Sequence, residues 1–183
     1  MNLLEWAHEE NDKVLMCDAD ICFMNTLPSV PENTLLGLSP HFIRESDEQR
    51  FGKYNGGFVY SASKDIPDAW RKATFTSRYF EQAALEDLTC LFKTDECPIQ
   101  NNYGWWRLLQ GSESITMIQK KWSINRKDGC GICVEGLPLF SIHTHWDTDD
   151  RATQYFNKFI MDYLFVLKSV KKTKELHVFL LKN

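Results

Sequence analysis

The chain of 183 residues is long enough for one globular domain with a sizeable core. Hydrophobic residues at 43% and charged residues at 25% are ordinary for a soluble globular protein. The net charge of −4 argues against a general nucleic-acid-binding protein and against binding to an anionic membrane surface. The longest apolar run, residues 159–167, is interrupted by Asp162, so we expect no membrane span and a single domain over residues 1–183.

The six cysteines lie at positions 17, 22, 90, 97, 130 and 133. Cys17 and Cys22 stand in an apolar segment, where reduced cysteine is the usual occupant. Because no export signal is visible, we expect free thiols and a cytoplasmic protein. Cys130 and Cys133 form an isolated C-x-x-C pair, which is compatible with a zinc site or with a surface turn, and its role stays open.

The first predicted elements are a helix over residues 3–10 and a strand over residues 14–17, buried on both faces. Asp18 and Asp20 follow this strand directly, and a second apolar run covers residues 21–24. Two carboxylates at the end of a buried strand need a counter-charge, and a divalent cation such as Mg²⁺ or Mn²⁺ provides it. The alternative is a pair of exposed aspartates in a turn.

Further along, a strand is predicted over residues 34–38 and another over residues 58–60. The second is preceded by Asn55-Gly56-Gly57. Paired glycines let the backbone approach a bulky group closely, although Asn-Gly is also the commonest turn dipeptide. We therefore leave open whether residues 55–57 line a binding site or form a plain turn.

The remaining middle elements are predicted as a solvated loop over 44–53, helices over 66–73 and 77–92, a loop over 94–104, a short helix near Trp105-Trp106 and a strand over 115–118.

Residues 139–147 are predicted as a strand, which places His143 and His145 on the same face. These histidines are metal-ligand candidates, or else a pair that is hydrogen-bonded within the core. An amphipathic helix over residues 159–167 is expected to close the domain. The basic run 168–174 is predicted to be a solvated helix end.

Four segments resemble, in order, the GT-A glycosyltransferases: residues 14–21, 54–60, 81–85 and 142–143. The resemblance extends from about residue 13 to about residue 165 and is closest to the nucleotide-diphospho-sugar transferases related to glycogenin and the galactosyltransferases. It implies an α/β fold with a GT-A-like (Rossmann-like) mixed central sheet flanked by helices.

The resemblance also implies a metal site for Mn²⁺ or Mg²⁺. Asp18 and Asp20 match the metal-binding Asp-x-Asp motif of the family, and Asp18 also matches a donor-binding position. His143 matches the late histidine that completes the metal site, with His145 as the alternate. Where the family continues into a glycine and a lysine that hold the diphosphate, this chain has residues 144–147, Thr-His-Trp-Asp.

Other family positions imply substrate contacts. Asn55, Gly56 and Gly57 match the segment that lines the donor sugar. Glu81 and Gln82 stand where the family often has Asp-Gln, close to the transferred sugar, and are the candidate catalytic residues.

Trp122 and Asn125 complete the candidate substrate-binding set.

The family places two or three strand–helix units before the Asp-x-Asp motif, and these form the pocket for base and ribose. Here only twelve residues precede Lys13, so the fold is expected to be N-terminally truncated. The chain would then be a fragment, obtain the missing half from another chain, or have lost catalysis. An uncovered sheet edge would also favour a homo-oligomer.

Three functions compete. The first is a metal-dependent glycosyltransferase that moves a sugar from a nucleotide-sugar donor, foremost a UDP-sugar, to a carbohydrate or protein hydroxyl. The second is a non-catalytic remnant of that fold that acts as a binding or interaction module. The third is a metal-dependent phosphohydrolase with Asp18 as nucleophile, for which the sequence offers no convincing set of further acidic ligands and phosphate-binding residues.

Overall fold

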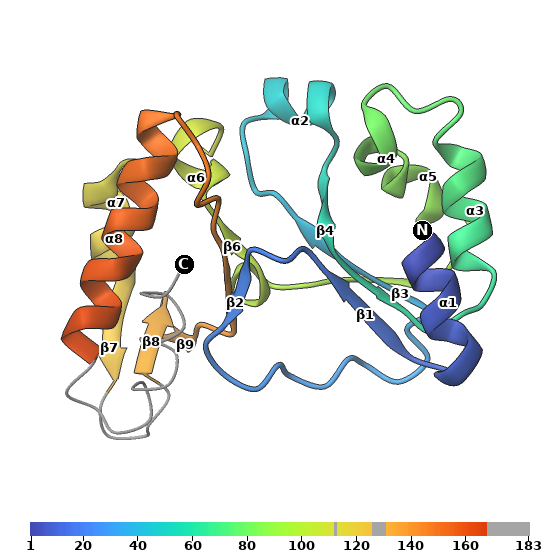
Figure 1. The fold of residues 1–183 in the computed structure, drawn as a ribbon, viewed down its shortest axis with the longest axis horizontal. Helices are drawn as coiled ribbons and strands as arrows, with labels where there is room; N and C mark the ends of the chain where they lie inside the picture. The colour runs from blue at the N-terminus through green and yellow to red at the C-terminus, as the bar shows by residue number, and fades with distance from the viewer. Residues whose placement is uncertain (112, 126–130, 168–183) are drawn as a thin grey trace.

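The computed structural model describes residues 1–111, 113–125 and 131–167. Within these ranges the strands form three sheets, with helices packed on their outer sides (Figure 1). This mixed α/β architecture confirms the expected fold class. Cys130, the basic run 168–174 and the end of the chain lie outside the described residues.

The first sheet has the strand order β1-β4-β3-β5, with bounds Val14–Cys17, Tyr54–Ser61, Leu36–Pro40 and Thr94–Glu96. β4 pairs antiparallel with both β1 and β3, whereas β5 runs parallel to β3. Because β1 is an edge strand, its four residues are only half-buried, and the predicted burial on both faces is wrong.

The second sheet places β10 (Ser141–His143) between β2 (Ile21–Phe23) and β6 (Tyr103–Gly104). β10 is antiparallel to β2 and parallel to β6. The third sheet is an antiparallel meander of β7 (Trp122–Asn125), β8 (Gly131–Val134) and β9 (Leu137–Pro138).

Two hydrophobic cores stabilise the two ends of the molecule. At one end, α1 (Asn2–Glu10), α3 (Ile66–Ala73) and α5 (Leu85–Leu88) pack on the first sheet around the fully buried Trp70 (Figure 1). At the other end, α7 (Ile115–Lys121) and α8 (Arg151–Leu167) enclose Tyr103 and Phe156, whose rings stack. α6 (Trp106–Leu109) joins this second group and confirms the expected short helix.

Several sequence predictions need correction because capping and tertiary packing override local pattern. The predicted loop 44–53 contains helix α2 (Glu45–Phe51), which ends where Gly52 adopts a positive φ of 95°. The predicted helix 77–92 begins only at Phe80, because Tyr79 is extended and Phe80 has a φ of 40°, and it is divided at Ala84 into α4 (Phe80–Ala83) and α5.

Two further corrections concern strands. Residues 115–118, predicted as a strand, belong to α7, because the Ser114 side chain caps the helix by accepting a hydrogen bond from the Met117 amide at 3.2 Å. Residues 94–104, predicted as a loop, contain β5, the 3₁₀ turn η1 (Ile99–Asn101) and β6.

None of the helices in residues 1–111, 113–125 and 131–167 has both the length and the apolar character needed to cross a bilayer.

A buried ionic network joins α6 to α7 and to the second sheet. The Glu113 carboxylate, 3% exposed, accepts hydrogen bonds from Arg107 at 2.8 Å, from Lys121 at 2.7 Å and from the Tyr103 hydroxyl at 2.7 Å. Burial opposes ionisation, but these donors lower the pKa of Glu113 to about 2. Arg107 in turn donates to the main-chain carbonyls of His41 and Phe42.

We expect Glu113→Gln to lower the free energy of unfolding by about 3–5 kcal/mol, because the substitution leaves the buried Arg107 guanidinium without its anionic partner. Urea unfolding followed by circular dichroism measures the change. As a matched control, Asp162→Asn removes the exposed ion pair with Lys158 and should cost less than about 0.5 kcal/mol. Equal losses in the two variants would contradict the prediction.

Candidate functional site

The site begins at a turn that connects two sheets. β1 belongs to the first sheet and β2 to the second, and only Asp18-Ala19-Asp20 lie between them. The Asp18 amide donates to the Gly57 carbonyl at 2.8 Å, and the Ile21 amide donates to the Asp18 carbonyl at 3.2 Å. The turn is therefore fixed by backbone hydrogen bonds on both sides, and it holds two carboxylates at the junction.

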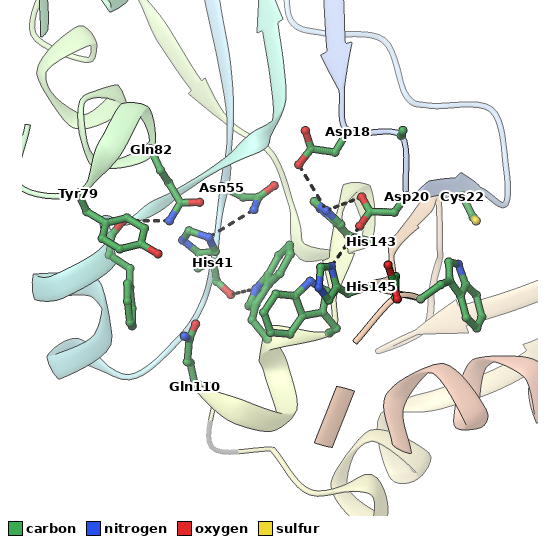
Figure 2. A pocket seen from close by; sticks show the side chains of 16 residues that line it. Asp18, Asp20, Cys22, His41, Asn55, Tyr79, Gln82, Gln110, His143 and His145 are labelled. Carbon is green, nitrogen blue, oxygen red and sulfur yellow. Dashed lines mark hydrogen bonds and ion pairs between the residues drawn. The ribbon is translucent and has the colours of Figure 1, made fainter. Parts of the chain in front are cut away.

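His143 completes the cluster from the last residue of β10, where it lies opposite Ile21 of β2. Its Nε2 atom is 3.1 Å from Asp20 Oδ1 and 3.6 Å from Asp18 Oδ2 (Figure 2). Each of the three residues offers one atom that could bind a metal ion, and these three atoms lie within 4.8 Å of one another. The Thr144 amide and hydroxyl both donate to the Asp20 carbonyl, at 3.1 and 2.8 Å, and bind the two segments together.

The two carboxyl groups respond differently to these surroundings. Burial raises the pKa of Asp18 against the opposing charge of His143, and the negative charges of Asp20 and Glu81 raise it further. Burial also works against ionisation of Asp20, but the hydrogen bond and charge of His143 lower its pKa below the usual value. Two adjacent carboxylates of this kind repel each other, and a shared cation relieves that repulsion.

The residues fit a hard divalent cation. Carboxylate oxygens and an imidazole nitrogen are ligands that Mn²⁺ and Mg²⁺ accept. Gly57 leaves the room this cluster needs: a Cβ there would lie 2.0 Å from Asp18 Oδ2 and 2.8 Å from the His143 ring. Glycine at this position therefore allows the Asp18 carboxylate and the His143 ring to approach each other.

His145 also lies near the Asp20 carboxylate, although it is outside strand β10. The strand predicted over residues 139–147 is shorter in the structure, where β10 covers only Ser141–His143. His145 nevertheless has its Nδ1 atom 3.7 Å from Asp20 Oδ2, with its side chain 48% exposed. It lies beside the cluster of Asp18, Asp20 and His143 and is not one of its three members.

A cavity of about 910 Å³ opens beside this cluster. Asp18, Asp20, His143 and His145 lie at one end, together with Trp146. A volume of this size accommodates a ligand as large as a nucleotide sugar.

The opposite end of the cavity is lined by neutral amides and rings. Gln82, Gln110 and Tyr79 lie on this side, and Figure 2 shows them well separated from Asp18 and Asp20. Of these three residues, only Gln82 is predicted from the sequence.

His41 lies in the wall between the two ends and was also missed. Its Nδ1–H donates to the Gly52 carbonyl at 3.1 Å, and Nε2 is 3.5 Å from the Asn55 amide nitrogen. The Trp106 indole donates to the His41 carbonyl at 3.0 Å, and the two rings meet edge to face. Burial lowers the pKa of His41 to about 4, which keeps the imidazole neutral near pH 7.

The predicted residues 55–57 lie in β4 and not in a turn. Asn55 lines the cavity, and its Oδ1 accepts from the Gly57 amide at 3.2 Å and from Asn102 at 3.1 Å. Its side-chain NH₂ therefore remains as the group that faces His41 and the cavity. Gly56 lies against Gln82, whose Cβ would be 3.7 Å from a Cβ added there.

Of the two candidate catalytic residues, Gln82 lines the cavity and Glu81 does not. Gln82 lines the cavity and is held by its own amide, which donates to the Phe51 carbonyl at 2.9 Å and accepts from the Gly56 amide at 3.4 Å. Glu81 is exposed and is not part of the lining, although its carboxylate lies near Gly56.

Trp122 and Asn125 do not reach the cavity. Trp122 is 4% exposed and packs in the second core, edge to face against Tyr103 and Phe159 at 5.1 Å each. Asn125 ends β7, opposite Gly131 of β8. Trp122 therefore serves the core, and the expectation that these two residues bind substrate does not match their positions.

The cysteines do not form a second site in the described chain. Cys17, Cys22, Cys90 and Cys97 are free thiols, as expected. Cys133 is buried in β8, so the alternative of a surface turn does not describe it, and its partner in the C-x-x-C pair lies outside the described residues.

No protein-family model matches the chain, and no curated protein matches it. Among solved structures, it is similar to LgtC, a glycosyltransferase, in a crystal structure of an active-site mutant, with 15% identity and a TM-score of 0.45. The alignment covers 82% of this chain and 61% of LgtC, so the chain spans less than two thirds of that protein's length.

We expect Gly57→Ala to lower Mn²⁺ affinity at least tenfold, because the new Cβ would displace the Asp18 carboxylate from the cluster. Gly56→Ala is the matched control, since a Cβ there meets its nearest atom at 3.7 Å, an ordinary contact. Calorimetric titration with Mn²⁺ measures both variants. Unchanged affinity in Gly57→Ala, with its fold intact by circular dichroism, would argue against Asp18 as a ligand.

We expect the free energy of unfolding to fall by about 3 kcal/mol, through the titration of His41, as the pH drops from about 6.5 to about 4. The unfolded chain binds a proton on this imidazole near pH 6.5, whereas the folded chain does so only near pH 4. The free energy of unfolding therefore falls as the pH is lowered through this window. In His41→Gln this component should disappear, while His145→Gln, at an exposed site, should retain it. Urea denaturation at a series of pH values separates the two.

Proposed function

We propose that the protein is a metal-dependent glycosyltransferase that moves a sugar from a nucleotide-diphosphate donor, foremost a UDP-sugar, to a hydroxyl acceptor. The observation that carries the proposal is the cluster of Asp18, Asp20 and His143 on the wall of a cavity large enough for such a donor. An isolated carboxylate pair would not suffice, but here an imidazole from a distant strand points at both carboxylates.

Asp18, Asp20 and His143 would hold the ion, with His145 beside Asp20 as an adjacent polar group. Bound Mn²⁺ or Mg²⁺ supplies positive charge to the phosphate oxygens of the donor and so stabilises the departing nucleoside diphosphate. Asp18 is the most exposed of the three, with 56% of its side chain accessible, and is therefore the ligand nearest to an incoming donor.

No lysine or arginine lines the cavity in the part of the chain that the structure describes. A diphosphate carries at least two negative charges, and Asp18, Asp20 and Asp147 would repel it. Donor binding should therefore depend strictly on the cation. Thr144-His145-Trp146-Asp147, which replaces the glycine–lysine segment of the family, supports the same expectation.

Transfer needs no oxidant and no protein nucleophile. The bond between the anomeric carbon and the diphosphate oxygen breaks with its electron pair going to that oxygen, a bond to the acceptor hydroxyl oxygen forms, and the proton of that hydroxyl passes to the departing diphosphate or to solvent. Gln82 is suited to hold the sugar, because its amide is fixed at both ends by backbone hydrogen bonds. The Asn55 NH₂ group is a second donor for sugar hydroxyls. Glu81 would need to turn toward the cavity to assist.

We expect wild-type protein to bind UDP in the presence of Mn²⁺ and to lose this binding by at least tenfold when Mn²⁺ is omitted or Asp20 is replaced by alanine. Asp20→Ala should still fold, because the hydrogen bonds from Thr144 go to the main-chain carbonyl of residue 20. Isothermal titration calorimetry is the measurement.

Asp68→Ala, which alters an exposed aspartate on α3, should bind UDP like the wild type. Binding of UDP that is equal with and without Mn²⁺, or absent from folded wild-type protein under both conditions, would contradict the proposal. Hydrolysis of a phosphate monoester that depends on Asp18 would favour the phosphohydrolase.

A further inference from the structure

An aromatic run leads from the cavity to the surface at the end away from Asp18 and Asp20. The rings of Phe51 and Tyr79 meet edge to face at 4.9 Å, and those of Tyr79 and Phe80 do so at 4.9 Å. Phe51 and Tyr79 line the cavity, whereas Phe80 is 72% exposed. The three rings thus continue the cavity wall into solvent.

The exposed position of Phe80 is imposed by the backbone. Phe80 has a φ of 40°, in the left-handed region that a bulky residue rarely adopts. Hydrogen bonds on both sides hold it there: the Trp70 indole donates to the Glu81 carbonyl at 2.7 Å, and Arg78 donates to the Gln49 carbonyl at 2.8 Å. An unfavourable conformation that its neighbours maintain, and that presents an apolar ring to water, points to a ligand for that ring.

The polar groups at this end of the cavity are neutral. Gln82, Gln110 and Asn55 offer amides, and His41, in the wall between the two ends, is an uncharged imidazole because burial lowers its pKa to about 4. Figure 2 shows Tyr79, Gln82 and Gln110 on the side opposite Asp18, Asp20 and Cys22. Neutral amides next to aromatic rings suit a ligand with many hydroxyls and apolar C–H faces, and they offer no counter-charge to an ion.

We propose that this end of the cavity binds a neutral oligosaccharide, and that Phe80 stacks against a sugar unit beyond the one held inside. The role of this saccharide as the acceptor rests on the proposed function. The binding of the saccharide to this end of the cavity does not depend on that function. Because the rings lie away from the metal ligands, saccharide binding needs no cation. Phe80 is then a specificity-determining residue that favours acceptors longer than a disaccharide.

The test uses a panel of di- and tetrasaccharides in gluco-, galacto- and manno-configuration, with glucuronate- and glucosamine-containing counterparts. Saturation-transfer NMR and tryptophan fluorescence follow binding to the wild type in EDTA. We expect at least one neutral tetrasaccharide to bind and to be favoured over its charged counterparts. Failure of every neutral saccharide to bind, or a preference for the charged ones, would overturn the proposal.

Phe80→Ala should weaken the best tetrasaccharide about fivefold and its disaccharide less than about twofold, because only the longer ligand covers the ring. Alanine keeps a Cβ at this backbone position and so does not relax the local conformation. Phe75→Ala, which removes another exposed phenylalanine, outside the cavity, should change neither affinity. Equal losses for both chain lengths in Phe80→Ala would also overturn the proposal.

Gly57→Ala separates this proposal from the proposed function. In that variant the metal site is impaired, but neutral saccharide binding should stay within about twofold of wild type. Saccharide binding by a wild-type protein that shows no Mn²⁺-dependent UDP binding would leave this inference standing and refute only the transferase. Mn²⁺-dependent UDP binding by a wild-type protein that binds no neutral saccharide would refute this inference alone.

Discussion

The site depends on the passage of the chain from one sheet to another within three residues. β1 ends at Cys17 and β2 begins at Ile21, and these strands pair with different neighbours, β4 and β10. The turn between them must therefore face both Gly57 of β4 and His143 of β10. Two carboxylates and an imidazole come together because the backbone pairing of both sheets holds their strands at this junction, and no flexible loop has to close around the ion.

The wall of the cavity depends on a second set of buried contacts. The main-chain carbonyl of His41 accepts from both Trp106 and Arg107, and Arg107 is held in turn by Glu113. The segment that carries His41 is thus tied to the second core, although it follows a strand of the first sheet. The ionic network stabilises the fold and also fixes the distance between the two sides of the cavity.

The sequence was sufficient for the parts of the site that follow from local pattern. Asp18 and Asp20 directly follow an apolar run, which predicts two carboxylates at the end of a strand. The place of His143 beside them is implied only by the resemblance to the GT-A glycosyltransferases, because the strand predicted over residues 139–147 runs past it. The position of His41 depends on contacts with Trp106 and Arg107 more than sixty residues away, which no local pattern reveals. The predicted substrate-binding role of Trp122 does not match its position for the same reason. Only the packing of its ring against Tyr103 and Phe159 shows that it belongs to the core.

The charges in the cavity are unevenly distributed, and this asymmetry limits what can bind at each end. Every ionisable carboxylate of the described lining lies at the end of Asp18 and Asp20, where it repels an anion until a cation binds. At the other end, the lining amides of Gln82 and Gln110 carry no charge, and His41, in the wall between the two ends, is neutral. An anionic ligand would therefore bind only together with the ion, whereas a neutral one could bind without it. The two halves of a transfer reaction, donor and acceptor, would thus differ in their dependence on metal although they share one cavity.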